Sequence, residues 1–243
     1  MCLTYTDRKI LPVIINVHGG GLIIGNKEFN RYFCALLCKK GFLVYSIEYR
    51  LIPDCLIYDQ IADVFMAMDY IKERLAADGG DSSHVYMAGD SGGACLITYA
   101  NAIQNSTNIA RAANVTPSGL RINALGLISG MFYTSRFDKI GLFLPKYLYG
   151  RDYKKTSFAK YVNPENRELL NSLAPVWLVT SHNDFLRRYT TDFEKALTRA
   201  EREHELVIFP KNKKLTHAFS VFEPFMPESG AVIDMMVEYL RKF

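Results

Sequence analysis

Residues 85–93 read Val-Tyr-Met-Ala-Gly-Asp-Ser-Gly-Gly, and this stretch decides the fold. A short apolar run of the kind found in strands leads directly into Gly89-Asp90-Ser91-Gly92-Gly93, and an apolar segment of helical length follows over 92–105. Glycines two positions before and after Ser91 permit a tight turn between strand and helix, which presents the hydroxyl at the head of the helix. Amide groups at a helix N-terminus favour negative charge on a nearby oxygen. The pattern predicts a reactive serine, although the motif alone also fits an ordinary strand-to-helix turn.

Outward from this motif, short β-branched runs alternate with longer amphipathic segments. In the segment 60–76, for example, Ile61, Val64, Met68 and Ile71 recur at three- and four-residue spacing and form one apolar face. Strands that are apolar throughout and separated by helices indicate a parallel sheet covered on both faces. We therefore expect an α/β protein with a doubly wound, mostly parallel sheet and helices on both faces. The predicted strands are 12–17, 42–49, 85–88, 124–129, 176–180 and 206–209, and the predicted helices are 29–40, 60–76, 92–105, 189–203 and 230–241.

Length and composition exclude several classes of protein. The 243 residues suffice for one sizeable domain, which we expect to span 1–243, and 49% of them are hydrophobic. A formal net charge of +4 with scattered basic residues does not favour a nucleic-acid partner. We also expect no membrane span and no secretory signal. Five cysteines without C-x-x-C spacing are typical of reduced thiols, so the sequence predicts a cytoplasmic location.

Two segments interrupt the alternation. Residues 105–123 are small and polar, which predicts a surface loop. Residues 131–173 are rich in both aromatic and charged side chains. This insertion could form a lid or pocket wall, or it could be a pair of satellite helices packed on the surface.

A second motif, His18-Gly19-Gly20-Gly21, directly follows the first predicted strand. Consecutive glycines allow backbone amides to turn toward a bound oxygen, as in the loop half of an oxyanion hole, whose other half comes from the residue after the nucleophile. A flexible or phosphate-cradling loop is the alternative, but the Lys-Ser/Thr pair of a phosphate-binding P-loop does not follow. The two motifs together are much more specific than either alone.

A serine nucleophile needs a base, and His217 lies just after the last predicted strand, where it is best placed to serve as one. A surface loop histidine is the alternative. The remaining histidines are less suited to this role: His18 belongs to the glycine loop, His84 opens a strand, His204 lies in a charged helix end, and His182 adjoins the candidate acid.

The acid should lie in the loop after the penultimate strand. Asp184 lies there, so the chain order Ser91, Asp184, His217 predicts a triad in which the carboxylate orients the imidazole. Asp192 is the runner-up, but it falls inside the next helical pattern and should face solvent. Asp90 should point away from the site if Ser91 points into it.

The letters Gly-Asp-Ser-Gly-Gly also occur around the serine of chymotrypsin-like proteases. That fold is all-β and places its histidine and aspartate before the serine. Here the flanking elements are a strand and a helix, and no Ala-His-Cys segment exists. The element order therefore opposes this alternative.

Taken together, these motifs resemble those of the hormone-sensitive-lipase-like branch of the α/β-hydrolases. The resemblance implies a carboxylesterase fold and triad, with an oxyanion hole formed by the amides of Gly20, Gly21 and Gly92. The motifs that carry it, in order, are His18-Gly19-Gly20-Gly21, Glu48-Tyr49-Arg50-Leu51-Ile52-Pro53, Gly89-Asp90-Ser91-Gly92-Gly93, Asp184-Phe185-Leu186 and His217-Ala218-Phe219.

The sequence departs from this family at several positions. The family usually has alanine at Gly92 or Gly93, proline at Phe185 and glycine at Ala218, and its N-terminal region supplies part of a cap over the acyl pocket that is reduced here. A sheet edge should therefore be exposed beside 12–17, which would favour a homodimer.

The sequence thus predicts a serine hydrolase that cleaves small-molecule carboxylic esters, with short apolar acyl groups and without a metal or organic cofactor. A peptidase, an amidase or an acetyl-sugar deacetylase could use the same triad. A catalytically inactive binding protein of this fold is a further alternative. The charges within 136–160 do not favour a lipase that acts at an interface.

Overall fold

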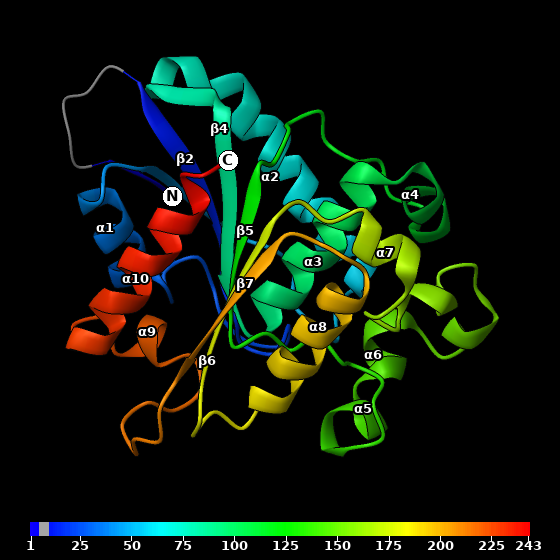
Figure 1. The fold of residues 1–243 in the computed structure, drawn as a ribbon. Coiled ribbons are helices and arrows are strands. Elements are labelled where there is room, and N and C mark those ends of the chain that lie inside the picture. Colours follow the sequence, from blue (N-terminus) through cyan, green and yellow to red (C-terminus); the bar gives the residue numbers. More distant parts are fainter. Residues whose placement is uncertain (5–9) are drawn as a thin grey trace.

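A seven-stranded sheet forms the centre of the molecule in the computed structural model, which describes residues 1–4 and 10–243 (Figure 1). The strand order is β1-β3-β2-β4-β5-β6-β7; β1 is antiparallel to β3, and the remaining neighbours are parallel. This arrangement confirms the predicted α/β fold. The strands are β1 (Cys2–Leu3), β2 (Leu11–Val17), β3 (Leu43–Ile47), β4 (Gly80–Asp90), β5 (Ala124–Ile128), β6 (Val176–Ser181) and β7 (His204–Phe209).

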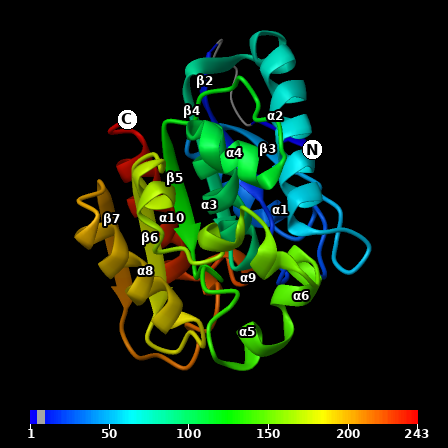
Figure 2. The same ribbon diagram turned by 90° about the vertical axis from the view of Figure 1, so that its right-hand side faces the viewer.

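Helices cover both faces of the sheet, because successive side chains of a strand point to opposite sides. In β2, Val13 and Ile15 belong to one buried cluster, whereas Ile14 between them belongs to the other. Figures 1 and 2 show the helices of these two layers on either side of the strands. The first layer contains α2 (Ile57–Asp78), α3 (Gly92–Asn105) and α8 (Arg187–Arg199), and the second contains α1 (Arg31–Lys39), α9 (Phe219–Phe222) and α10 (Pro227–Leu240).

Two local expectations from the sequence are wrong. The segment 105–123 is not all loop, because α4 (Thr107–Ala113) forms within it. The Ser106 hydroxyl accepts a hydrogen bond from the Ile109 amide and caps this helix, whose Ile109 side chain is buried. His204 does not end a helix but begins β7, where its ring lies between Thr198 and the Arg202 carbonyl.

The expected free edge beside 12–17 is also wrong. Strand β2 lies inside the sheet, hydrogen-bonded to β3 on one side and β4 on the other. The strand that follows β2 in sequence crosses over to its outer side, so β3 and not β2 lies toward that edge, where β1 pairs with it at Val44 and Tyr45. The basis for expecting a homodimer through 12–17 is therefore removed.

Residues 131–173 fold into short helical pieces, some of which pack on α2 and α3. Tyr149 and Phe158 from this segment surround Tyr99 of α3, and the Tyr99 and Tyr149 hydroxyls lie 3.0 Å apart. Its aromatic residues are thus divided between a buried anchor and a more exposed outer part. The pieces are α5 (Lys139–Phe143), α6 (Pro145–Tyr149), 3₁₀ turns at Tyr153–Lys155 and Ala159–Tyr161, and α7 (Arg167–Asn171).

Glu168 joins the last part of this segment to α4. Its carboxylate accepts hydrogen bonds from the Tyr161 hydroxyl at 2.6 Å and the Asn108 side-chain amide at 2.9 Å. These donors lower the pKa of Glu168 from its ordinary value of 4.5 to about 2. The carboxylate therefore favours the folded state above pH 4.5, and this contribution is lost as the pH falls toward 2.

Glu168→Gln should lower the free energy of unfolding by about 1 kcal/mol at pH 7, because charge-assisted hydrogen bonds become neutral ones. The difference from the wild type should shrink as the pH falls from 5 toward 3. Urea unfolding at several pH values measures this, with Glu238→Gln on the exposed side of α10 as the control. A difference that is the same at every pH would contradict the role of the Glu168 charge.

Candidate active site

The turn between β4 and α3 holds Ser91 in a strained backbone conformation, with φ of 51° and ψ of −116°. Such strain is concentrated at functional sites. The flanking glycines are required by close packing, because a Cβ at Gly89 or Gly93 would meet the carbonyl oxygen of Val17. The turn therefore confines the chain tightly and leaves the serine side chain at the carboxyl end of the sheet.

Ser91, His217 and Asp184 form one continuous hydrogen-bonded chain. The imidazole Nε2 of His217 lies 2.9 Å from Ser91 Oγ, and its Nδ1 lies 2.7 Å from Asp184 Oδ1. The three residues follow β4, β6 and β7, whose carboxyl ends meet at one edge of the parallel sheet. In such an arrangement a carboxylate fixes the tautomer of an imidazole, which can then accept the proton of a hydroxyl nucleophile.

Asp184 is buried and held by its own loop. Thr180 Oγ1 donates to Asp184 Oδ2 at 2.9 Å, and the Leu186 amide donates to Oδ1 at 2.8 Å. Burial by itself would raise the pKa of the carboxyl, but the hydrogen bond and charge of His217 outweigh it and hold the pKa below the ordinary value. Asp184 is therefore ionised at neutral pH.

The loop that carries His217 makes a turn of its own. Ala218 has a φ of 49°, a left-handed conformation that glycine adopts without strain. This conformation accounts for the glycine that usually stands here in the family that the sequence resembles. The Ala218 amide donates to Ser129 Oγ at 3.2 Å. On the other side, the ring of Phe185 lies over the imidazole with the two centroids 4.4 Å apart.

The glycine loop lies beside the serine turn. Gly20 and Gly21 have φ values of 100° and 63°. A Cβ on Gly92 would lie 3.1 Å from the Gly21 nitrogen, so the Gly21 and Gly92 amides border the same space. Within the described part of the chain, the amides of Gly20, Gly21 and Gly92 donate to no backbone carbonyl outside helices and strands. Amides in such a position are the kind of donors that an anionic oxygen binds.

Asp90 anchors the glycine loop from within. Its Oδ1 accepts from the Gly19 amide at 3.0 Å and from Asn30 Nδ2 at 2.8 Å, and Asn30 also reaches Asn16 at 3.3 Å. As expected, Asp90 points away from the Ser91 hydroxyl. Complete burial raises the pKa of the Asp90 carboxyl, and the hydrogen bond from Asn30 opposes this rise. No motif in the sequence points to Asn30, which lies 60 residues before Asp90.

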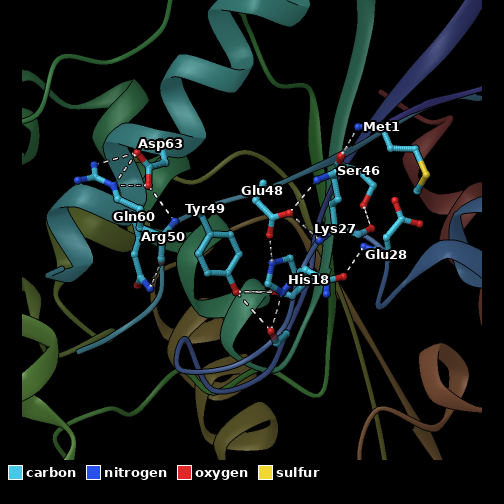
Figure 3. Close-up of polar contacts among 12 residues, drawn as sticks. Met1, His18, Lys27, Glu28, Ser46, Glu48, Tyr49, Arg50, Gln60 and Asp63 are labelled. Atoms are coloured by element: carbon cyan, nitrogen blue, oxygen red, sulfur yellow. Dashed lines mark hydrogen bonds and ion pairs between the residues drawn. The ribbon is translucent and has the colours of Figure 1, made fainter. Parts of the chain in front are cut away.

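His18 supports the same loop from its other end (Figure 3). Its ring stacks on Tyr49 with centroids 4.4 Å apart, and the Tyr49 hydroxyl donates to the His18 carbonyl at 2.7 Å. The ring Nε2 lies 3.6 Å from Glu48. Burial lowers the pKa of His18 despite that carboxylate, so its imidazole is neutral and structural. The motif around Glu48 and Tyr49 therefore buttresses the loop.

The next residues of that motif complete the support. The Leu22 carbonyl at the end of the glycine loop accepts from the Ile52 amide at 3.0 Å and from Gln60 Nε2 at 3.0 Å. Arg50 pairs with Asp63 of α2, with its Nε 2.9 Å from Oδ2 (Figure 3). The loop is thus tied to α2 as well as to β3.

An apolar pocket of about 350 Å³ opens beside the glycine loop. It begins at Gly21 and at Met131, whose amide donates to the Ser91 carbonyl at 2.9 Å. Its outer wall comes from α5 and α6. The lining residues are Gly21, Ile23, Met131, Lys139, Ile140, Phe143, Leu144 and Tyr147.

A larger hollow of about 880 Å³ lies on the outer side of β3, between Glu48, Met66 and Tyr70. None of Ser91, Asp184 and His217 lines it. The runner-up Asp192 does not join the triad; it pairs with Arg136 at 2.9 Å, and its side chain is 23% exposed. Among residues 1–4 and 10–243, no three His, Cys, Asp or Glu side chains are placed together to hold a metal ion.

Asp90→Ala should lower the free energy of unfolding by about 2–5 kcal/mol, because two buried donors lose their acceptor. Asp192→Ala removes ion pairs of a carboxylate that is partly exposed, and it should cost less than Asp90→Ala. Chemical unfolding of both variants tests this. Equal costs would contradict the anchoring role of Asp90.

This chain is similar to known proteins over most of its length. Residues 14–220 match a protein family described as alpha/beta hydrolase fold. The chain is similar to a solved structure of esterase B from Lactobacillus rhamnosis, with 23% identity and a TM-score of 0.90 over 98% of this chain and 78% of that one.

Two plant proteins are also similar in sequence. A probable isoprenylcysteine alpha-carbonyl methylesterase of Oryza sativa subsp. japonica is 28% identical over 174 residues, which cover 67% of this chain and 42% of that protein. Tuliposide A-converting enzyme b1, amyloplastic, of Tulipa gesneriana is 30% identical over 120 residues, which cover 45% of this chain and 32% of that protein. The chain thus spans less than half the length of these relatives. Fold, motifs and family match agree, and the chain belongs to the hormone-sensitive-lipase-like branch of the α/β-hydrolase fold family.

Proposed function

We propose that this protein is a serine hydrolase that cleaves small-molecule carboxylic esters through an acyl-enzyme. The observation that carries this proposal is the position of the His217 imidazole, 2.9 Å from Ser91 Oγ and 2.7 Å from Asp184 Oδ1. The Gly20, Gly21 and Gly92 amides beside it complete what acyl transfer requires: a nucleophile, a base, an orienting acid and donors for an oxyanion.

The reaction follows from this geometry. His217 Nε2 takes the proton of Ser91 as Oγ attacks the ester carbonyl, and the carbonyl oxygen becomes an oxyanion facing Gly21 and Gly92. When this intermediate collapses, the imidazolium gives the proton to the departing alcohol, which leaves Ser91 acylated. Water then repeats the attack, with His217 as base and Ser91 as leaving group. Asp184 stays ionised and stabilises each imidazolium.

The acyl group belongs in the pocket beside Gly21. His217 must protonate the alcohol oxygen, so the alcohol leaves on the imidazole side of Ser91 and the acyl chain takes the opposite side. The open pocket of about 350 Å³ beside Gly21, bordered by Phe143 and Tyr147, has a mostly apolar lining and receives this chain. Its size and lining favour short apolar acyl groups. Residues 131–173 then serve as a pocket wall within a single hydrolase domain, 1–243, rather than as a detached lid.

Ester cleavage is favoured over the alternatives on the same triad, which are peptidase, amidase and acetyl-sugar deacetylase activity. Similar proteins carry the names methylesterase and esterase. An inactive binding protein would gain nothing from the strained φ of 51° at Ser91. A panel of acyl esters, aminoacyl amides and acetylated sugars separates the alternatives.

We further propose that the protein works in the cytoplasm. All five cysteines are free thiols, and four are buried. Burial raises the pKa of Cys34 and Cys95 to about 12, so these thiols are unreactive. Among the helices of the described residues, none is long and apolar enough to cross a membrane. Because β2 lies inside the sheet, we do not propose a homodimer.

Ser91→Ala and His217→Ala should each lower kcat for p-nitrophenyl acetate by about a thousandfold or more, because the residues act as one unit. The double variant should be about as inactive as either single one. Initial-rate kinetics measure this, and Asp192→Ala should keep wild-type rates. Undiminished hydrolysis by Ser91→Ala would overturn the proposed function.

Ile140→Phe adds bulk to the acyl pocket and should therefore penalise longer acyl groups selectively. We expect kcat/KM for p-nitrophenyl butanoate to fall about tenfold relative to that for the acetate, which is the effect of one or two misplaced methylenes. Circular dichroism checks that the variant folds. An equal fall for both esters would argue that the acyl chain lies elsewhere.

A further inference from the structure

Phe185 is an exposed aromatic residue fixed at the catalytic edge. Its neighbours Asp184 and Leu186 are buried, whereas the Phe185 side chain is 72% exposed. The backbone on both sides is held, because the Asp184 amide donates to the Ser181 carbonyl at 3.2 Å and the Arg187 amide to the Asp184 carbonyl at 3.1 Å. The backbone of the loop is therefore held in place, and it presents the apolar ring of Phe185 to solvent.

The ring contacts the base of the triad. Its centroid lies 4.4 Å from that of the His217 imidazole, at an interplanar angle of 43°. During acylation the alcohol oxygen must come within about 3 Å of His217 Nε2 to receive its proton. A substituent on that oxygen is then within reach of the Phe185 ring.

The acyl pocket does not compete for this position. It is lined from the glycine loop, from Met131 and from α5 and α6, and no residue of the Asp184 or His217 loops contributes to it. The acyl pocket and the Phe185 ring are thus built from different loops and lie at different places around the site.

We infer that Phe185 is a specificity-determining residue for the alcohol half of the substrate and selects esters of aromatic alcohols. This inference rests on the proposed ester hydrolysis and names its substrate class. A flat ring on the departing alcohol stacks on Phe185 while its oxygen is aligned with His217 Nε2. Ethyl and other small alkyl groups leave the ring uncovered and gain nothing from it.

The expected size of the effect follows from ring contacts. Aromatic pairs contribute a free energy beyond the area that they bury, which corresponds to a rate factor of about two to twelve in kcat/KM. Benzyl butanoate and cyclohexylmethyl butanoate have the same acyl group and alcohols of similar size and basicity. The ratio of kcat/KM for these two esters therefore measures the effect of the aromatic character of the alcohol.

The test compares Phe185→Leu and Phe185→Trp with the wild type on benzyl, cyclohexylmethyl and ethyl butanoate. Phe185→Leu should lower kcat/KM for the benzyl ester about three- to tenfold and change that for the ethyl ester less than about twofold. Phe185→Trp, which keeps an aromatic face, should retain the benzyl preference. Phe137→Ala is the control: it removes a phenylalanine that is 91% exposed and should leave the ratios of kcat/KM among the three esters unchanged.

Two results would overturn the inference. If Phe185→Leu lowers kcat/KM equally for all three esters, the ring acts only on the imidazole. If Phe185→Leu leaves the preference for the benzyl over the cyclohexylmethyl ester unchanged, the alcohol lies elsewhere. Both results presuppose ester turnover by the wild type. Absence of turnover on every ester would instead refute the proposed function itself.

Discussion

The imidazole of His217 is the point on which the rest of the structure converges. It hydrogen-bonds at the same time to a carboxylate 33 residues before it and to a hydroxyl 126 residues before it. In this chain, parallel strands that end together bring these distant residues within 3 Å of one ring. The register of β4 through β7 and the two buried clusters that cover the sheet are therefore the physical precondition of the site.

Much of the remaining structure keeps the glycine loop in place. Three glycines in succession are flexible, and ordering them costs entropy. The loop is held at its start by Asp90 and Tyr49 and at its end by Gln60. A loop fixed in this way can present its amides to an oxyanion without reorganisation during the reaction.

The sequence predicted the elements that local patterns encode. Apolar runs marked six of the seven strands, and the Gly-x-Ser-x-Gly motif marked the turn at Ser91, because close packing allows only glycine beside it. The order of Ser91, Asp184 and His217 matched three side chains that the structure brings together.

Strand order was harder to predict, since the crossover that places β3 outside β2 leaves no local trace. Partnerships across long stretches of sequence were not predictable either: Asn30 meets Asp90 only because α1 begins beside the end of β2. Phe185 stood out in sequence only as a departure from the usual proline, and its contact with His217 gives that departure a physical meaning.

The central claim is that Ser91 becomes covalently acylated through the base His217. The most direct measurement is mass spectrometry of peptides from protein incubated with a fluorophosphonate, which reacts with activated serines and locates the modified residue. We expect one adduct, on Ser91, formed much more slowly in the His217→Ala variant. An adduct on another residue, or labelling of Ser91 at the same rate without His217, would contradict the claim.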